Sequence, residues 1–279
     1  MSSATVAENK RHFNAVLVNT FIANLTTTFV WTAVTFWLYL ETRSVLVTSL
    51  FGGSYMLLLA LMGVPFGSWI DRTRKKRVMV VAQFVTSVLF AVSLAVFLVA
   101  PREEILTIGS PWFVAFLLPL LVGAVMESAR GIALGTIVTL LIPDSERARA
   151  NGLVGIVTGL TFAVTSVFAG LAIGQLGITI SLVLAVGLTV LSLLHLWTVR
   201  IPEPEIVHVD GAPKAVDFSG AWQAIKAVPG LIWLIIFTTF NNLLGGVFLA
   251  LMDPYGLSLV SVEVWGLMWG VLSFGFLIG

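Results

Sequence analysis

The sequence predicts an all-α integral membrane protein. Of its 279 residues, 58% are hydrophobic and only 10% are charged, whereas soluble domains carry about 25% charged residues. Long apolar runs recur along the chain, and each could cross a hydrocarbon core of about 30 Å as a helix. Short connectors rich in Lys and Arg separate several of these runs, which is typical of membrane helices joined by tight loops.

Eight apolar runs are the expected membrane helices. They cover approximately residues 14–40, 45–70, 78–100, 111–141, 150–174, 177–199, 229–252 and 261–279. The polar start, Met1 to His12, lacks a small-residue cleavage site, so we expect the first run to stay as a helix rather than leave as a signal peptide. The last run is still apolar at Gly279, so either the eighth helix ends there or the sequence is a fragment.

The longest connector divides the chain into two expected groups of helices. It contains Pro202, Pro204 and Pro213, and Trp222 lies where a short helix on the inner leaflet, or a plain extension of the next span, is expected. The predicted parts are a six-helix bundle at residues 1–200, a cytoplasmic linker at 201–228 and a partial second bundle at 229–279.

Basic residues predict the orientation. With the amino terminus in the cytoplasm, inner segments hold twelve of the fifteen Lys and Arg residues, outer loops hold Arg43 and Arg102, and Arg130 lies within a span. Because Lys and Arg collect in short cytoplasmic loops, this bias predicts a multi-pass protein of the inner (plasma) membrane. The densest cluster lies in residues 67–77, which we call the basic hairpin.

Two charged residues of the fourth span, Glu127 and Arg130, are candidate pathway residues. Three residues apart, they lie on one helix face, where the ion pair lowers the cost of burying each charge. In one interpretation they serve a substrate or proton pathway, with Glu127 taking up the proton. In the other they form a structural ion pair that holds the span against a neighbouring helix.

A polar stripe on the first span is the second candidate site. Thr20, Asn24, Thr28, Trp31 and Thr35 recur at spacings of three and four, so they share one helix face. The stripe either lines an aqueous cavity, where the Trp31 ring offers a flat surface to a lipophilic ligand, or hydrogen-bonds to packed helices.

Other polar or small residues within the spans have open interpretations. In the seventh span, Asn241 and Asn242 precede Gly245 and Gly246, which either loosen the helix at a transport site or allow close packing. In the fifth span Gly152, Gly155 and Gly159 predict a packing edge. His195 near the inner end of the sixth span is expected to be interfacial rather than a proton relay.

The sequence offers no enzyme constellation. It has no cysteine, no histidine cluster for a metal, and no glycine loop with its lysine for a phosphate. We therefore expect no enzymatic activity, no cofactor and no nucleic-acid partner. The expected partners are a small-molecule substrate, the lipid bilayer and, as a hypothesis, protons.

The basic hairpin carries a family resemblance. Its pattern Gly67-x-x-x-Asp71-Arg72-x-x-Lys75-Lys76 resembles the loop motif of major facilitator superfamily transporters, between the second and third spans. Two features look like the macrolide-efflux and siderophore-exporter branch. They are the basic pair Arg74 and Lys75 in the hairpin and the stretch Ile142-Pro143-Asp144-x-x-Arg147-x-Arg149-Ala150-Asn151-Gly152. The resemblance implies an MFS-type bundle: six helices, a long inner connector and six more, of which the chain holds two.

The resemblance also implies roles in a conformational gate. Gly67 would allow close helix approach, Asp71 would contact the positive end of a helix in the second bundle, and Arg72 would pair with Asp144, or with Glu146 in its place. In the fifth span Gly159 is followed by Leu160, which departs from the family's antiporter motif.

The leading interpretation is a secondary transporter. It would export a lipophilic or amphipathic small molecule by rocking two bundles about a central cavity, with proton coupling as a hypothesis. The alternative is a truncated membrane protein that does not transport and acts as an interaction partner or an inactive fragment.

Overall fold

The computed structural model describes residues 3–203, 218–273 and 275, and every regular element among them is helical. The elements in order are α1 (Ser3–Thr42), α2 (Val45–Arg72), α3 (Lys75–Val99), α4 (Arg102–Leu106), α5 (Pro111–Leu141), η1 (Asp144–Glu146), α6 (Arg147–Leu171), η2 (Ala172–Leu176), α7 (Gly177–Thr198), α8 (Phe218–Ala227), α9 (Leu231–Leu259) and α10 (Val262–Ser273). The prediction of an all-α membrane fold is confirmed.

Local sequence explains where several helices begin. The Ser110 side chain accepts a hydrogen bond from the Phe113 backbone N–H at 3.0 Å, and Pro111 occupies the first turn, so α5 begins where predicted. The π-helical turn η2 follows α6, and Gly177, with φ of 76°, begins α7. A positive φ favours glycine, so this residue allows the chain to reverse there.

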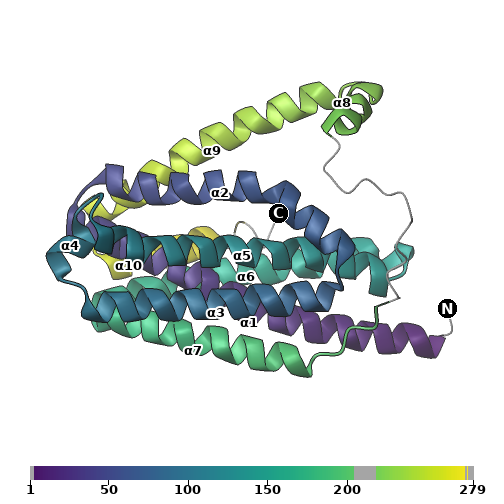
Figure 1. Ribbon diagram of the computed structural model, residues 1–279, viewed down its shortest axis with the longest axis horizontal. Helices are drawn as coiled ribbons and strands as arrows, with labels where there is room; N and C mark the ends of the chain where they lie inside the picture. Colours follow the sequence, from purple (N-terminus) through teal and green to yellow (C-terminus); the bar gives the residue numbers. More distant parts are fainter. Residues whose placement is uncertain (1–2, 204–217, 274, 276–279) are drawn as a thin grey trace.

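The first seven helices form a bundle around α1 and α5 (Figure 1). Helix α3 packs against α5 and α7, α1 packs against α6 and α7, and α2 packs against α5. The bundle has one end at the basic hairpin, which we call the hairpin end, and an opposite end at α4, which we call the α4 end.

Two hydrophobic clusters fill the bundle, one toward each end. The cluster toward the α4 end includes Phe36, Phe90 and Phe116, and the cluster toward the hairpin end includes Met79 and Ile137. On α1, α3 and α7 the residues between the two clusters include buried polar side chains, and on α5 the buried Arg130 contacts them. The bundle therefore encloses a polar layer at mid-height.

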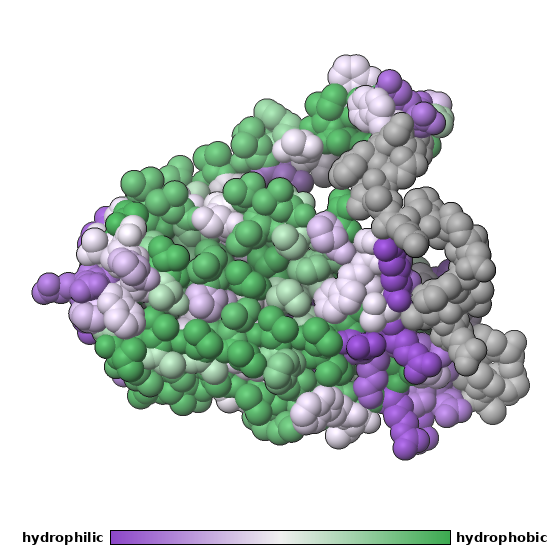
Figure 2. Space-filling model, in the orientation of Figure 1, coloured by the Kyte–Doolittle hydropathy of each residue, from purple (hydrophilic) through white to green (hydrophobic). Residues whose placement is uncertain are grey.

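The surface fits a membrane-spanning protein. Figure 2 shows a broad hydrophobic band over the bundle, with hydrophilic residues at both ends. Six stretches of the described residues are long and apolar enough to cross a membrane, and one of them, Asp144–Thr198, comprises η1, α6, η2 and α7. Helix α10 is a shorter apolar helix.

The last helices differ from the expectation in two respects. Helix α9 diverges from α2 (Figure 1) and continues without interruption to Leu259, seven residues beyond the expected end of the seventh span. Gly245 and Gly246 lie in this continuous helix, and a methyl group added at either would meet no atom within 4 Å. Among the described residues they neither break the helix nor bring another helix close, and a role at a transport site stays a prediction. Helix α8 corresponds to the short helix expected in the linker, of which residues 204–217 lie outside the described part.

Helix α10 packs against α6 through glycines. A Cβ atom on Gly170 would lie 2.6 Å from the Val262 carbonyl oxygen, and one on Gly266 would lie 2.6 Å from the Ser166 carbonyl oxygen. Among the described residues, Gly152 and Gly155 do not form the predicted packing edge. Both are exposed, with no atom within 4 Å of an added Cβ, whereas Gly159 is buried. Small residues do mediate the packing of α6, but they lie nearer its α4 end.

We expect the substitution Gly266→Ala to destabilise the protein by about 1–3 kcal/mol, because the added methyl group would push one helix backbone against another. The matched control is Gly155→Ala, whose methyl group meets no neighbour and which should be neutral or stabilising by up to about 1 kcal/mol. Thermal unfolding of the purified chain in detergent measures both. Equal unfolding midpoints for the two variants would contradict the close contact.

Candidate functional site

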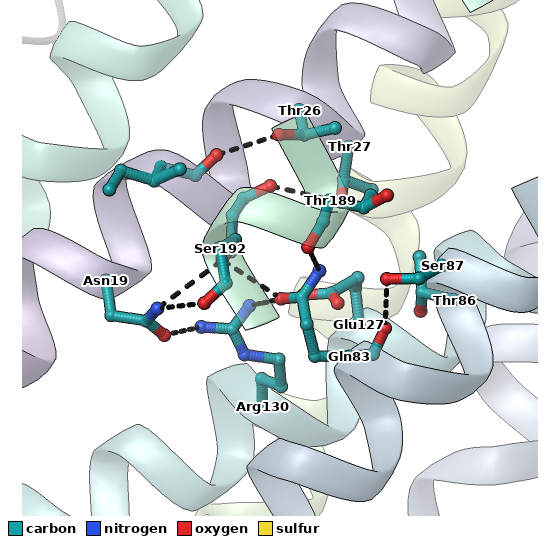
Figure 3. A network of polar contacts seen from close by, with 12 residues as sticks. Asn19, Thr26, Thr27, Gln83, Thr86, Ser87, Glu127, Arg130, Thr189 and Ser192 are labelled. Carbon is teal, nitrogen blue, oxygen red and sulfur yellow. Dashed lines mark hydrogen bonds and ion pairs between the residues drawn. The ribbon is translucent and has the colours of Figure 1, made fainter. Parts of the chain in front are cut away.

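The Arg130 guanidinium is the centre of the polar layer. Its Nη2 donates to Asn19 Oδ1 at 2.7 Å, and its Nη1 donates to Gln83 Oε1 and to Glu127 Oε2, the latter at 3.1 Å. Figure 3 shows the Arg130 side chain directed at Asn19 and Gln83. Arg130 is 4% exposed, and Asn19 and Gln83 are buried as completely. Three helices therefore contribute acceptors to one buried cation.

Helix α7 completes this arrangement. Asn19 Nδ2 donates to the Ser192 carbonyl oxygen at 2.8 Å and lies 3.3 Å from His195 Nδ1. Gln83 accepts from the Ser192 hydroxyl at 3.3 Å, and its Nε2 donates to the Thr189 carbonyl oxygen at 3.5 Å (Figure 3). We call the set Asn19, Gln83, Glu127, Arg130, Thr189, Ser192 and His195 the polar network. It links α1, α3, α5 and α7.

The two charged side chains of the polar network, Arg130 and Glu127, differ in their hydrogen-bond partners. Arg130 donates to three side chains. Glu127 pairs with Arg130 and interacts with the Thr86 hydroxyl, and its Oε1 is buried without a hydrogen-bond partner among the described residues. Loss of the Glu127 charge would leave the guanidinium with two amide oxygens. Two of the three acceptors that position the cation are thus independent of the carboxylate.

The centre of the polar stripe on α1 packs against aromatic rings of α2. Asn24, Thr28 and Trp31 are half-buried, and the Trp31 ring packs on Phe51 at 4.7 Å and on Tyr55 at 4.6 Å between centroids. Tyr55 of α2 in turn interacts electrostatically with Glu127. The structure therefore brings an aromatic surface and a buried carboxylate together between α1, α2 and α5.

The ends of this stripe are buried. Thr20 and Thr35 are 7% and 8% exposed, and neither hydroxyl has a hydrogen-bond partner among the described residues. They do not form the cross-helix hydrogen bonds of the packing interpretation.

The polar patch of α9 lies apart from the polar network. Asn241 and Asn242 are exposed, and the Asn241 amide donates to the Phe237 carbonyl oxygen of its own helix at 3.0 Å. An apolar groove of about 560 Å³ between α9 and the α4 ends of α1 and α2 is lined by residues that include Tyr39, Val45 and Tyr255. Neither feature includes a residue of the polar network, so a role for Asn241 and Asn242 stays a prediction.

In the basic hairpin, Lys75 and Lys76 contact the connector that follows α7. Glu203 accepts the backbone N–H of Lys75 at 2.6 Å and that of Lys76 at 2.7 Å, and the Lys76 ammonium donates to the carbonyl oxygens of Trp197 and Val199. A carboxylate at this position satisfies free N–H groups of the first turn of α3. The hairpin is thereby joined to the start of the linker.

The structure gives the positions of the remaining gate residues but does not test their roles in a gate. Asp71 is exposed, and a methyl group added at Gly67 would meet no atom within 4 Å, so no described segment makes the close approach that the resemblance implies. Asp144 pairs with Arg147 at 2.6 Å, and Glu146 pairs with Lys10 at 2.8 Å. The pairing of Arg72 with Asp144 stays a prediction.

Sequence reasoning missed several neutral members of the polar network. Asn19 and Gln83 each interrupt an apolar run, and an amide within a membrane helix is the signal that could have found them. It also missed Asp253, because the seventh span was expected to end at residue 252. In the structure the Asp253 carboxylate lies within α9 and accepts the indole N–H of Trp265 at 3.0 Å and of Trp269 at 2.7 Å.

Comparisons with known proteins give the family and the fold. The family model described as Major Facilitator Superfamily matches residues 16–279. A solved structure described as a bacterial homolog of the human lysosomal transporter Spinster, in an inward-facing and unoccupied conformation, superposes with a TM-score of 0.65 at 18% sequence identity. The match covers 94% of this chain and 60% of that one, so the chain spans about three fifths of the length of the protein it resembles. No curated protein sequence matches the chain. The extent of the family match, over nearly the whole sequence, shows that the chain belongs to the Major Facilitator Superfamily.

Proposed function

We propose that the chain acts in a secondary transporter that exports a lipophilic or amphipathic small molecule in exchange for protons. The observation that carries the proposal is the difference in hydrogen bonding between the two buried charges. Arg130 has three acceptors, whereas one oxygen of the Glu127 carboxylate has no hydrogen-bond partner among the described residues. An ionisable residue inside a membrane bundle is most often part of a substrate or ion pathway. Family membership gives the coarse function, a membrane transporter, and the polar network supports the coupling.

The proposed substrate class follows from the surroundings of Glu127. The stacked rings of Trp31, Phe51 and Tyr55 offer an apolar face, and Asn24 and Thr28 offer a few polar groups along the same helix. Such a mixture binds amphipathic compounds with modest polarity. Export, rather than uptake, rests on the resemblance of the basic hairpin to the efflux branch.

The proposed orientation places the hairpin end in the cytoplasm. The basic residues Arg72, Arg74, Lys75, Lys76 and Arg77 cluster there, together with Lys10 at the start of α1. The charge bias of short loops favours this arrangement, with a cytoplasmic amino terminus in the inner (plasma) membrane. Alternating access would then open the site beside Glu127 first to the hairpin end and next to the α4 end.

We expect the substitution Glu127→Gln to abolish the response of transport to a pH gradient, since glutamine keeps the shape and can accept from Arg130 but cannot exchange a proton. The measurement is uptake of rhodamine 6G, an amphipathic dye, into liposomes containing the purified chain, with and without a pH gradient. Proton movement is followed with pyranine inside the same vesicles.

The matched control is Glu103→Gln, which removes an exposed carboxylate of α4 at the bundle surface. This variant should keep the response to the gradient. A Glu127→Gln chain that responds to the gradient as the unaltered protein does would remove Glu127 from the coupling mechanism.

A further inference from the structure

His195 lies one turn from the hairpin end of α7 and contacts Asn19 of the polar network directly. Its Nδ1 is 3.3 Å from Asn19 Nδ2, and the same Asn19 amide holds Arg130 through its oxygen at 2.7 Å. The side chain is half-buried, whereas Asn19 and Ser192 are fully enclosed. His195 is thus the most exposed of the three and sits between the buried charges and the hairpin end.

The hydrogen bonds around Asn19 decide which protons His195 carries. A guanidinium can only donate, so the Asn19 oxygen must face Arg130 and its amino group must face α7. The Ser192 carbonyl oxygen, which can only accept, lies 2.8 Å from that amino group and agrees with the assignment. The Asn19 amino group therefore also faces His195 Nδ1, which must accept. An accepting Nδ1 corresponds to the ring tautomer that carries its proton on Nε2.

A protonated ring cannot keep this contact. Its Nδ1–H would point at the Asn19 amino group, and two donors would face each other. Rotation of the Asn19 amide would not relieve the conflict, because it would turn the amino group toward Arg130 and the oxygen toward the Ser192 carbonyl. Protonation of His195 therefore breaks this contact, either by turning the half-buried ring away from Asn19 or by releasing the Asn19 oxygen from Arg130.

We infer that His195 is a positioning residue through which protons at the hairpin end control the hold of Asn19 on Arg130. In the neutral form the ring stabilises the three-acceptor arrangement of Arg130. In the protonated form the guanidinium loses one of its two amide oxygens and depends more on Glu127. The inference rests on the proposed function, since Arg130 and Glu127 form the proposed coupling pair.

Charged groups on neighbouring elements have other described partners. On α1, His12 faces Glu8 at 3.7 Å, and Lys10 pairs with Glu146. On α3, Lys76 donates to the carbonyl oxygens of Trp197 and Val199, beside His195, and on α5 Arg130 reaches His195 through Asn19. No carboxylate of the described residues pairs with His195. The amide of Asn19 is therefore the group that senses its protonation.

The first experiment tests the contact without transport. In the full-length chain carrying His12→Asn and His208→Asn, His195 is the one remaining histidine of three, and ¹⁵N NMR of labelled histidine reports which ring nitrogen is protonated. At about pH 7.5, where histidine is ordinarily neutral, we expect the Nε2–H tautomer. Replacement Asn19→Leu should give a mixture of tautomers. A proton on Nδ1, or a ring that is unaffected by Asn19→Leu, would overturn the inference.

The second experiment tests the function of the contact. Acidifying the solution at the hairpin end from about pH 7.5 to about pH 5.5, where histidine ordinarily titrates, should change the initial rate of rhodamine 6G transport by about fivefold, the factor for a lost hydrogen bond of about 1 kcal/mol. His195→Asn provides a permanent acceptor near the Nδ1 position, so its transport rate should be the same at the two pH values. His195→Lys should give the acid rate at both pH values.

The control His12→Asn should respond like the unaltered chain. An unchanged pH response in His195→Asn would overturn the inference, even if Glu127→Gln abolishes coupling to the gradient. Conversely, if Glu127→Gln leaves the gradient response intact and the NMR result is as expected, the His195–Asn19 contact stands and the proposed coupling residue fails.

Discussion

The substitution Arg130→Met is expected to destabilise the folded protein by about 3–5 kcal/mol, because it leaves the Glu127 carboxylate buried without its counter-ion. The side chains of Glu127 and Arg130 are 8% and 4% exposed, so water cannot replace the lost partner. Asn19 and Gln83 would each lose the cation to which their oxygens now accept. The measurement is thermal or denaturant unfolding of the purified chain in detergent.

A double substitution separates the charge effect from loss of packing. Removing both charges in Glu127→Leu/Arg130→Met should recover most of the stability, since no uncompensated charge remains in the bundle. Arg130→Lys should be intermediate, because an ammonium keeps the ion pair but cannot reach three acceptors with one planar group. If Arg130→Met does not fold, recovery of a folded double variant still supports the argument. A double variant no more stable than Arg130→Met would contradict it.

The sequence predicts the membrane helices because their signal is local and strong. Apolar runs and short basic connectors determine α2, α3 and α5 to within three residues of the expected bounds. The end of α9 was missed because Asp253 and Pro254 resemble the start of a loop. Inside a membrane, neighbouring indole N–H groups satisfy the carboxylate and the helix continues.

The candidate site could be predicted only in part. Glu127 and Arg130 stand out because charges are rare in membrane spans, and their i,i+3 spacing predicts the observed ion pair. The contacts of Arg130 with Asn19 and Gln83 join residues 111 and 47 positions apart, and sequence spacing cannot reveal such pairs. The same limit applies to His195, which looked interfacial because nothing in its own helix shows that Asn19 of α1 lies opposite.

Replacing Asp253 by alanine is expected to destabilise the protein by about 2–4 kcal/mol, the order of magnitude for two hydrogen bonds to one charged acceptor. Both indole N–H groups donate to the same Oδ1 atom, at 3.0 Å from Trp265 and 2.7 Å from Trp269. Trp265 is 3% exposed, so its N–H would find no water after the substitution. Asp253 lies about 9 Å, or six residues, before the end of α9 at 1.5 Å per residue.

Replacing Asp253 should also affect the contact between α10 and α6. Trp269 also packs edge-on against Phe162 of α6, with ring centroids 5.6 Å apart, so Asp253 orients a ring that contacts the first bundle. Asp253→Asn keeps an oxygen that can accept both N–H groups and should lose less stability than Asp253→Ala. The control Ser258→Ala removes an exposed hydroxyl that bonds within its own helix and should be neutral. Because Asp253 acts through the indoles, Asp253→Ala should cost much less in a Trp265→Phe/Trp269→Phe chain, and an unchanged cost there would assign the effect to another contact.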